Sequence, residues 1–357
     1  MKKRESYIEF ARIIACISII FAHTHFYNNN YAIKLVTGQC GVPLFFMITG
    51  YVLFNKNHDY KKILNKVIFK FIIPVFILTS FSVLFSDWIL GEKTIISCIT
   101  SIKLSNFIQP LLGVILLTFP DYRDILSQLW FFRDYIPLLI SYPLLKSICP
   151  SKENKESTIC RRIILIMLLL SIIIRDLNDL NIINVNSMAT YSIIYVLIGY
   201  EIKLHKDSLI NNNVKKIIII SFLISIGLLL RQTVYTIDSQ IYMNFLNRQN
   251  LPTIMYTTGL FILFLNIGLV FKESNSINYI AHQTYEIYLI HYLIIAKFKT
   301  TNFYAFLNNK VLSFNYHQQF ILEIVYTLII FIISLIIVIV IKEIIKITKK
   351  IHLKKIT

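Results

Sequence analysis

The sequence predicts an all-α protein, a polytopic bundle of about ten transmembrane helices with both chain termini in the cytoplasm. Three observations predict this class. First, 56% of the 357 residues are hydrophobic, only 15% are charged and the mean hydropathy is +0.64, which excludes an ordinary soluble chain. Second, apolar windows of membrane-spanning length recur along the whole chain. Third, lysine and arginine are distributed unevenly between these windows.

Ten apolar windows are long enough, or nearly long enough, to cross a bilayer. In chain order they cover residues 7–27, 38–54, 67–90, 126–145, 162–175, 187–202, 216–231, 251–271, 279–296 and 319–342. The fifth and sixth are short. The stretch 91–128 is apolar but is interrupted by Asn106, Pro110, Gly113 and Pro120, so it predicts a re-entrant or surface-lying piece. No soluble region is appended, and residues 1–357 are expected to form a single membrane-embedded domain.

The basic residues set the expected orientation. The formal net charge is +17. With the N-terminus in the cytoplasm, 24 of the 36 lysines and arginines fall in inside segments and ten in outside segments, while Arg12 and Arg133 lie within spans. This bias follows the positive-inside rule. It explains the charge without a nucleic-acid partner, and it gives the basic run 342–355 a role in contacting membrane lipids.

The first span carries ionisable residues that are costly at membrane depth and that therefore mark function. These are Glu9, Arg12 and His23. Arg12 and His23 are eleven residues apart, which is close to three helical turns and places both on one face, about 16 Å apart along the axis. Glu9 lies three residues before Arg12 and can pair with it. The alternative interpretation is a structural ion pair with an interfacial histidine.

The second span and the segment after it contain the next informative residues. The run GVPLFFMITGYVL, residues 41–53, has small residues that permit close helix packing. Beyond it, Lys66 and Lys70 are four residues apart and lie on one helix face at the cytoplasmic side. Two cations there either bind a phosphate-rich soluble ligand or simply anchor the helix, and charge alone favours the anchor.

Four motifs, taken together, resemble membrane acyltransferase family 3. The first is the pattern of Glu9, Arg12, Ala15 and His23, and the second is GVPLFFMITGYVL. The third is QLWFFR, residues 128–133, which is similar to the "LWF" segment of the family. The fourth is YEIYLIH, residues 285–291, which is similar to its late "IYLxH" segment. The motifs occur in the family's order over nearly the whole chain.

The resemblance implies a ten-helix membrane acyltransferase domain that uses a cytoplasmic acyl-CoA donor, commonly acetyl-CoA. The acceptor it implies is a hydroxyl of a lipid-linked or surface polysaccharide, and acyl-CoA and saccharide are therefore the expected partners. Members carry an arginine pair after the second helix, where this chain has Lys66 and Lys70, so the charge is kept but bidentate geometry is lost. Gln128 stands where a histidine or tyrosine is common, and no acid or base is assigned there.

Acyl transfer from a thioester to a hydroxyl needs a base and donors that stabilise an oxyanion. His23, near the outer end of its helix, is the expected general base because neutral imidazole accepts a proton near neutral pH. His25 lies on another face and is expected to have a hydrogen-bonding or interfacial role. Arg12, with Lys66 and Lys70, is expected to bind the phosphate or pantetheine part of the donor. The five cysteines show no metal-ligand spacing, and no bound cofactor or metal is expected.

Glu9, Trp130, Arg133 and His291 are expected to support the site. Trp130 and Arg133 are candidates for lining the cavity, although Trp130 also suits an interfacial anchor and Asp134 offers Arg133 a structural partner. His291 belongs to the late motif, but a histidine at the end of an apolar helix is usually structural.

A second class of function gives the same composition and helix count. An exporter or flippase for a polysaccharide or its lipid-linked precursor also needs a polar path between helices, but it needs neither acyl-CoA nor a base at one depth. No inverted repeat or pair of broken helices is visible, which counts against a secondary transporter. Either protein is expected to be a multi-pass protein of the cell (inner or plasma) membrane.

Overall fold

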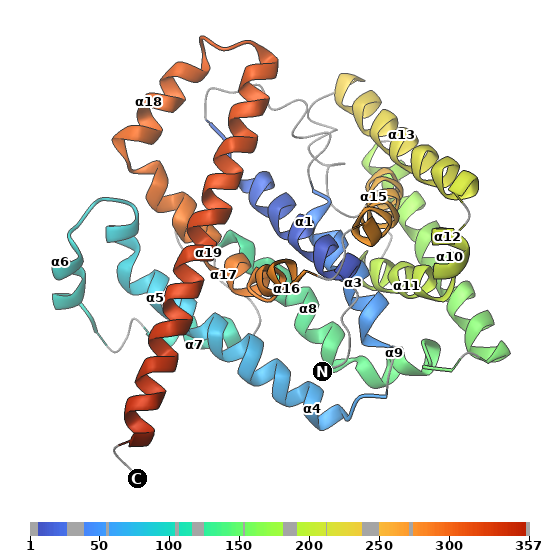
Figure 1. Ribbon diagram of the computed structural model, residues 1–357, viewed down its shortest axis with the longest axis horizontal. Helices are drawn as coiled ribbons and strands as arrows, with labels where there is room; N and C mark the ends of the chain where they lie inside the picture. Colours follow the sequence, from blue (N-terminus) through green and yellow to red (C-terminus); the bar gives the residue numbers. More distant parts are fainter. Residues whose placement is uncertain are drawn as a thin grey trace. The chain divides into compact units, whose positions relative to one another are not determined.

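The computed structural model consists of helices joined by turns and loops (Figure 1). It describes residues 6–26, 39–54, 57–103, 107–115, 125–152, 154–180, 191–211, 213–237, 250–270 and 274–354. No β-strand occurs within these ranges. The predicted all-α class is therefore confirmed.

Within the described ranges, six helical stretches are long and apolar enough to cross a membrane. They are Ser6–His23, Tyr60–Ile89, Lys155–Asp179, Lys216–Val234, Leu251–Gly268 and Tyr316–Thr348. Each overlaps one of the ten predicted windows. The structure thus has the helices of a multi-pass membrane protein.

The other four windows contain shorter helices. These are α3 (Gly41–Leu53), α8 (Trp130–Ile140), α11 (Tyr191–Leu204) and α17 (Thr284–Lys299), with 13, 11, 14 and 16 residues. Some window ends, such as residues 27, 38 and 187–190, lie outside the described ranges. A count of ten spans and the cytoplasmic placement of both termini stay predictions.

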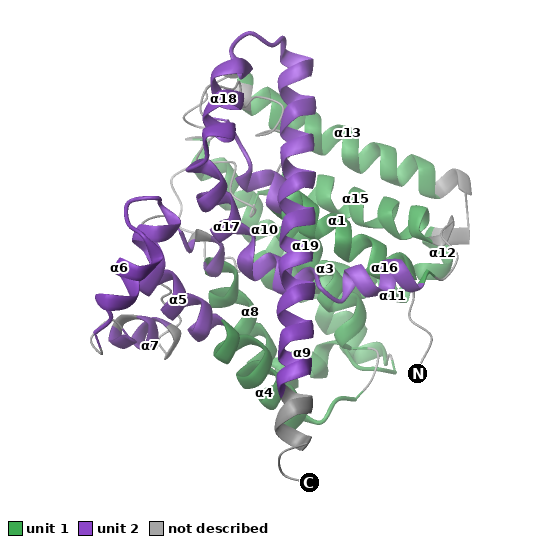
Figure 2. Ribbon diagram, turned by 60° about the vertical axis from the view of Figure 1, so that its left-hand side comes forward, with its two compact units in different colours: residues 1–19, 31–74, 130–274 green, residues 20–30, 75–129, 275–357 purple. Residues whose placement is uncertain are grey.

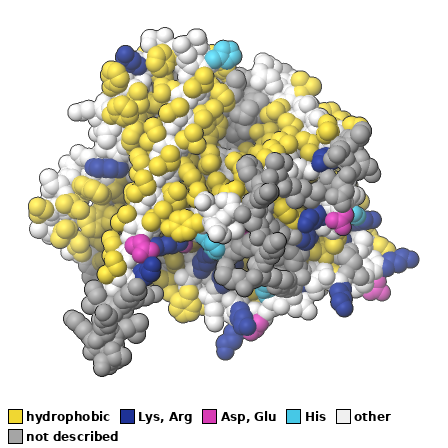
Figure 3. Space-filling model, in the orientation of Figure 1, with side chains coloured by type: hydrophobic (Ala, Val, Ile, Leu, Met, Phe, Trp, Pro, Cys, Tyr) yellow, Lys and Arg dark blue, Asp and Glu magenta, His cyan; other side chains and the backbone are white. Residues whose placement is uncertain are grey.

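Large apolar side chains are exposed along the long helices. On α10 (Lys155–Asp179) they include Ile166, Met167 and Leu170, with exposed fractions of 57%, 62% and 52%. Figure 3 shows hydrophobic side chains over much of one face of the molecule. Surfaces of this kind suit a lipid environment, since lipid removes the cost of exposing apolar groups to water.

The chain divides into two compact units, each built from separated segments (Figure 2). Unit 1 comprises residues 1–19, 31–74 and 130–274, and unit 2 comprises residues 20–30, 75–129 and 275–357. Helix α1 (Ser6–His23) contributes residues to both. The single domain expected from the sequence stays a prediction.

In unit 1, α3 and α11 lie in very close contact. A Cβ on Gly50 would lie 1.9 Å from the carbonyl oxygen of Val196, and a Cβ on Gly199 would lie 2.0 Å from that of Met47. Only glycine permits this approach, as in other membrane helix pairs. The remaining helices of the unit include α4 (Tyr60–Lys66), α9 (Tyr142–Ile148), α12 (Lys206–Asn211), α13 (Asn213–Ile237) and α15 (Leu251–Val270).

A buried arginine ties together three helices of unit 1. Arg161 on α10 is fully buried and pairs with Glu201 of α11 at 2.7 Å. It also donates to the carbonyl of Ile148, at the end of α9, at 3.0 Å, and it lies 4.8 Å from the ring centroid of Tyr200. Each contact helps to compensate the buried charge of Arg161, so losing any of them would be costly. These contacts therefore hold α9, α10 and α11 together at this point.

Unit 2 is centred on α17, which contacts α18 (Asn302–Val311), α19 (Tyr316–Lys354) and the 3-10 turn η4 (Ser127–Leu129). The residues that follow α1 join this group. The Thr24 and Thr327 hydroxyls are 2.6 Å apart, and the Phe26 ring stacks on that of Tyr304. The unit also contains α16 (Asn275–Ala281) and all but the first two residues of α5 (Ile73–Ile89).

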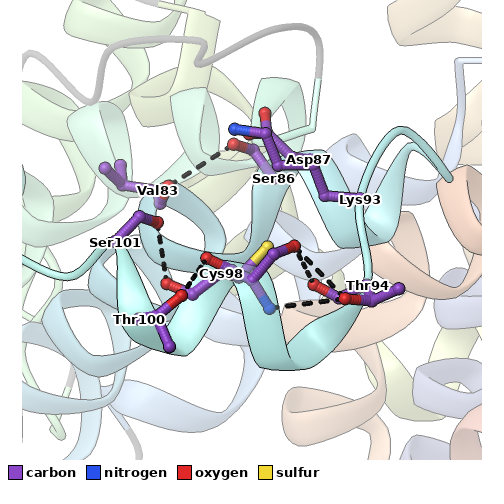
Figure 4. Close-up of polar contacts among 9 residues, drawn as sticks. Val83, Ser86, Asp87, Lys93, Thr94, Cys98, Thr100 and Ser101 are labelled. Atoms are coloured by element: carbon purple, nitrogen blue, oxygen red, sulfur yellow. Dashed lines mark hydrogen bonds and ion pairs between the residues drawn. The ribbon is translucent and has the colours of Figure 1, made fainter.

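The apolar stretch after α5 contains the short helices α6 (Ile95–Thr100) and α7 (Ile108–Ile115). Figure 4 shows Thr94 at the start of α6, where its hydroxyl accepts from the Ser97 amide at 3.3 Å, with Lys93 and Asp87 nearby. Lys93 and Asp87 form an ion pair at 2.7 Å. Neither helix is long enough to span a membrane, in keeping with the predicted re-entrant or surface-lying piece, although Asn106 and Pro120 lie outside the described ranges.

Candidate active site

The predicted pairing at the start of α1 is confirmed. Arg12 Nη1 lies 2.6 Å from Glu9 Oε2, one helical turn away. The Glu9 side chain is 7% exposed and that of Arg12 is 25% exposed. The ion pair neutralises a carboxylate that would be costly to bury alone, and it leaves part of the guanidinium accessible.

The lysine pair lies where an α-helix changes to a π-helix. Asp59 caps α4 by accepting from the Lys61 amide at 3.0 Å, and α4 ends at Lys66. Lys70 lies in the following π-helical turn η1 (Val67–Ile72), in which the Ile73 amide donates to the carbonyl of Ile68. The sequence predicted a span over residues 67–90 and no π-helical turn within it. Pro74 offers a physical reason for the wider turn, because it has no amide hydrogen for the Lys70 carbonyl.

Two further cations of unit 1, Lys70 and Arg12, act electrostatically on Lys66. Lys66 lies close enough to Lys70 and to Arg12 for both positive charges to act on it. Both lysine side chains are exposed. Two of the three residues predicted to bind the donor are thus within electrostatic range of the third, Lys66, where a multiply charged anion would be favourable. Their role in donor binding stays a prediction.

Trp130 and Arg133 lie at the start of α8, in unit 1. Trp130 is half-buried, with its ring centroid 6.5 Å from that of Phe131. Arg133 is exposed and forms no hydrogen bond or ion pair with any described residue. Asp134, the structural partner that the sequence offered for it, instead accepts a hydrogen bond from the Tyr191 hydroxyl. The role of Arg133 in a cavity stays a prediction.

In unit 2, the end of α1 and the middle of α17 bring two histidines together. The ring centroids of His23 and His291 are 5.6 Å apart, and that of Tyr292 is 5.1 Å from His23. His23 is half-buried, whereas His291 is fully buried. The general base and the supporting histidine expected from the sequence are therefore neighbours, although 267 residues separate them along the chain.

His291 is held by its own helix. Its Nδ1 lies 2.6 Å from the carbonyl oxygen of Tyr288. Its Nε2 is buried and has no hydrogen-bond partner among the described residues. A buried polar atom without a partner is uncommon in proteins, and it points to a ligand or a catalytic role.

Gln128, in η4, contacts the turn of α17 that precedes His291. The Gln128 side chain is fully buried, and its Nε2 donates to the Leu289 carbonyl at 3.2 Å. The backbone carbonyl of Gln128 accepts from the Tyr288 hydroxyl. Its Oε1 has no partner within the described part of the chain. Sequence reasoning assigned no role to Gln128, although an amide next to the "LWF" motif at membrane depth was a usable signal.

Two other ionisable residues of unit 2, His25 and Glu286, form structural contacts, and a third, Glu323, was not predicted from the sequence. The carbonyl of His25 accepts from the Tyr304 hydroxyl at 3.0 Å, and Glu286 pairs with Lys342 at 2.9 Å. Glu323, on α19, is 1% exposed, and its position inside an apolar window was a signal that sequence reasoning did not use. No group of three or more His, Cys, Asp or Glu side chains in the described residues is arranged to hold a metal ion.

The long apolar helices define a multi-pass membrane protein. Two separate polar clusters belong to it: the Glu9–Arg12 ion pair in unit 1 and the neighbouring His23 and His291 in unit 2. The chain belongs to acyltransferase family 3, because the model of that family, described as an acyltransferase domain, matches residues 5–343. All four motifs lie within this match. The protein is therefore a membrane acyltransferase. No curated protein and no solved structure matches the chain.

Proposed function

We propose that this membrane acyltransferase is an O-acetyltransferase of the cell (inner or plasma) membrane. It moves an acetyl group from cytoplasmic acetyl-CoA to a hydroxyl of a cell-surface or lipid-linked polysaccharide. The observation that carries the proposal is the placement of His23 beside the buried His291. A neutral imidazole in a site lined by polar groups is suited to take the proton of a hydroxyl.

The donor side of the proposal rests on Arg12, Lys66 and Lys70. Their three neighbouring positive charges, two of them on exposed side chains, suit the phosphates of coenzyme A. With the N-terminus in the cytoplasm, these charges lie toward the inner end of α1 and His23 lies toward its outer end. Eleven residues of helix span about 16 Å, a length comparable with an extended pantetheine arm.

In the chemical step, His23 accepts the proton of the acceptor hydroxyl as the oxygen attacks the thioester carbonyl. The tetrahedral intermediate then collapses, the carbon–sulfur bond breaks and the thiolate of coenzyme A takes the proton from His23. The products are an acetyl ester and free coenzyme A. A route through an acyl-enzyme on His23 would use the same residues, and Glu9 would keep Arg12 oriented toward the donor.

The test is transfer of radiolabelled acetyl from acetyl-CoA to glycan in membranes that contain the protein. We expect label with the wild type and none with Arg12→Ala or His23→Ala. His25→Ala is the matched control, because it removes a half-buried histidine two residues away and keeps the carbonyl that Tyr304 contacts. Gel filtration in detergent checks that each variant folds.

Two outcomes would contradict the proposal. Full activity of a folded His23→Ala protein would exclude His23 as the base. Absence of labelled glycan with the wild type, combined with glycan export that depends on the protein, would favour the exporter or flippase instead.

A further inference from the structure

Two buried acceptor atoms lie in or against the turn Tyr288–His291 of α17, and neither has a hydrogen-bond partner in the described part of the chain. They are Gln128 Oε1 and His291 Nε2. We propose that these two atoms accept hydrogen bonds from hydroxyl groups of the acceptor that flank the one being acetylated. The inference rests on the proposed O-acetyltransferase function and deepens it, because it assigns residues and a chemical class to acceptor recognition.

The tautomer of His291 follows from its contact with Tyr288. A backbone carbonyl can only accept a hydrogen bond, so Nδ1 at 2.6 Å from it must carry the proton. In a buried ring, which is neutral because an unpaired charge would be costly there, Nε2 then presents a lone pair. His291 therefore offers an acceptor and not a donor on the side that has no protein partner.

The amide of Gln128 is fixed by the same reasoning. Its nitrogen donates to the Leu289 carbonyl at 3.2 Å, and a flipped amide would place two oxygen acceptors against each other. The Tyr288 hydroxyl donates a hydrogen bond to the backbone carbonyl of Gln128. Packing and orientation are thus already secured without Oε1, which leaves this oxygen for a ligand.

The lone pairs on these two atoms define the chemistry of the ligand. They attract O–H donors and repel a phosphate or a carboxylate, since those groups bring further lone pairs and a negative charge. A saccharide with adjacent neutral hydroxyls supplies such donors. A protein site built to bind a hydroxyl discriminates strongly against an analogue that lacks it.

The experiment measures labelled acetyl transfer in membranes to octyl β-glycosides of glucose, galactose and mannose, to their monodeoxy analogues and to the octyl glucuronide. The variants are Gln128→Met, which keeps the length and removes the amide, and Gln319→Met as the matched control. Gln319 donates to two backbone carbonyls, of Val311 and Phe314, in the turn before α19.

With the wild type we expect loss of one hydroxyl beside the acetylated position to lower kcat/KM about tenfold, mainly through KM, because one hydrogen bond to a buried group is lost. Gln128→Met should lower kcat/KM for the parent glycoside by the same factor and show no further loss with that deoxy analogue. Gln319→Met should keep the wild-type pattern. The glucuronide should be a poorer acceptor than the neutral glycosides.

A Gln128→Met protein that is equally impaired on every acceptor and still discriminates between them would overturn the proposal, since its role would be structural. If Gln128→Met fails to reach the membrane, the wild-type data alone test the proposal. A change in kcat/KM below twofold for every deoxy analogue would also overturn it. Labelling of the native glycan without transfer to any glycoside refutes this inference only. Absence of label on the native glycan as well refutes the proposed function.

Discussion

Replacement of Lys66 and Lys70 by alanine tests whether these residues bind the donor or only anchor a helix. Both side chains are exposed, so each contact with a phosphate should contribute at the level of a surface ion pair, about 0.5–1 kcal/mol. At 1.4 kcal/mol per factor of ten, each lysine corresponds to about a two- to fivefold effect, and the pair to about 5- to 30-fold. The expected change is a rise in KM for acetyl-CoA with little change in kcat.

The assay is initial-rate acetyl transfer in membranes at several donor concentrations and two salt concentrations. The rise in KM should shrink at high salt, because exposed charges are screened. The matched control is the double alanine variant of Lys61 and Lys62, which are also exposed and lie with Lys66 on α4. An equal KM in the two double variants would refute donor binding by Lys66 and Lys70 and would support the anchor interpretation.

Three further predictions concern packing. Gly50→Ala, whose new Cβ would lie 1.9 Å from a carbonyl oxygen of α11, should lower stability in detergent by about 1–3 kcal/mol. Gly259→Ala, whose new Cβ would lie 2.8 Å from the Ile224 side chain and 3.2 Å from its backbone nitrogen, should cost less, and equal thermal midpoints would contradict this. A double-mutant cycle of Thr24→Val and Thr327→Val should give a coupling of about 0.6 kcal/mol, and a value of zero in denaturant titrations would mean that the 2.6 Å contact is not stabilising. Arg161→Met, which leaves a carboxylate without its buried cation, should cost about 3–5 kcal/mol, and an unchanged melting temperature would argue against the proposed role in joining α9, α10 and α11.

The long spans were predictable because hydropathy and length are properties of a local window. The break between α8 and α9 and the π-helical turn at Val67–Ile72 were not predicted. Pro137 and Pro143 in the first case and Pro74 in the second were visible, but a proline in a membrane helix is compatible with a kink, a break or no change. Which of these occurs depends on neighbouring helices.

The candidate site was predictable to the extent that it is local. The pairing of Glu9 with Arg12 follows from a spacing of three residues on one helix. The proximity of His23 to His291 depends on how α1 and α17 pack, which no spacing encodes. The resemblance placed both histidines in motifs but did not say that they are neighbours. Gln128 was visible beside a motif, yet only its contacts with α17 indicate what its oxygen is available for.

The two neighbouring histidines differ in how costly a positive charge on the ring would be, and this difference supports their separate proposed roles. The two ring centroids are 5.6 Å apart. Protonation of both rings at once would therefore place two cations together in a largely apolar setting. His291 is fully buried, so a charge on it would be the more costly. His23 is half-buried, so a positive charge formed on it during turnover would be less costly than one on His291. A base must change its charge, whereas a residue that orients the acceptor should keep a lone pair throughout, and these requirements match His23 and His291 respectively.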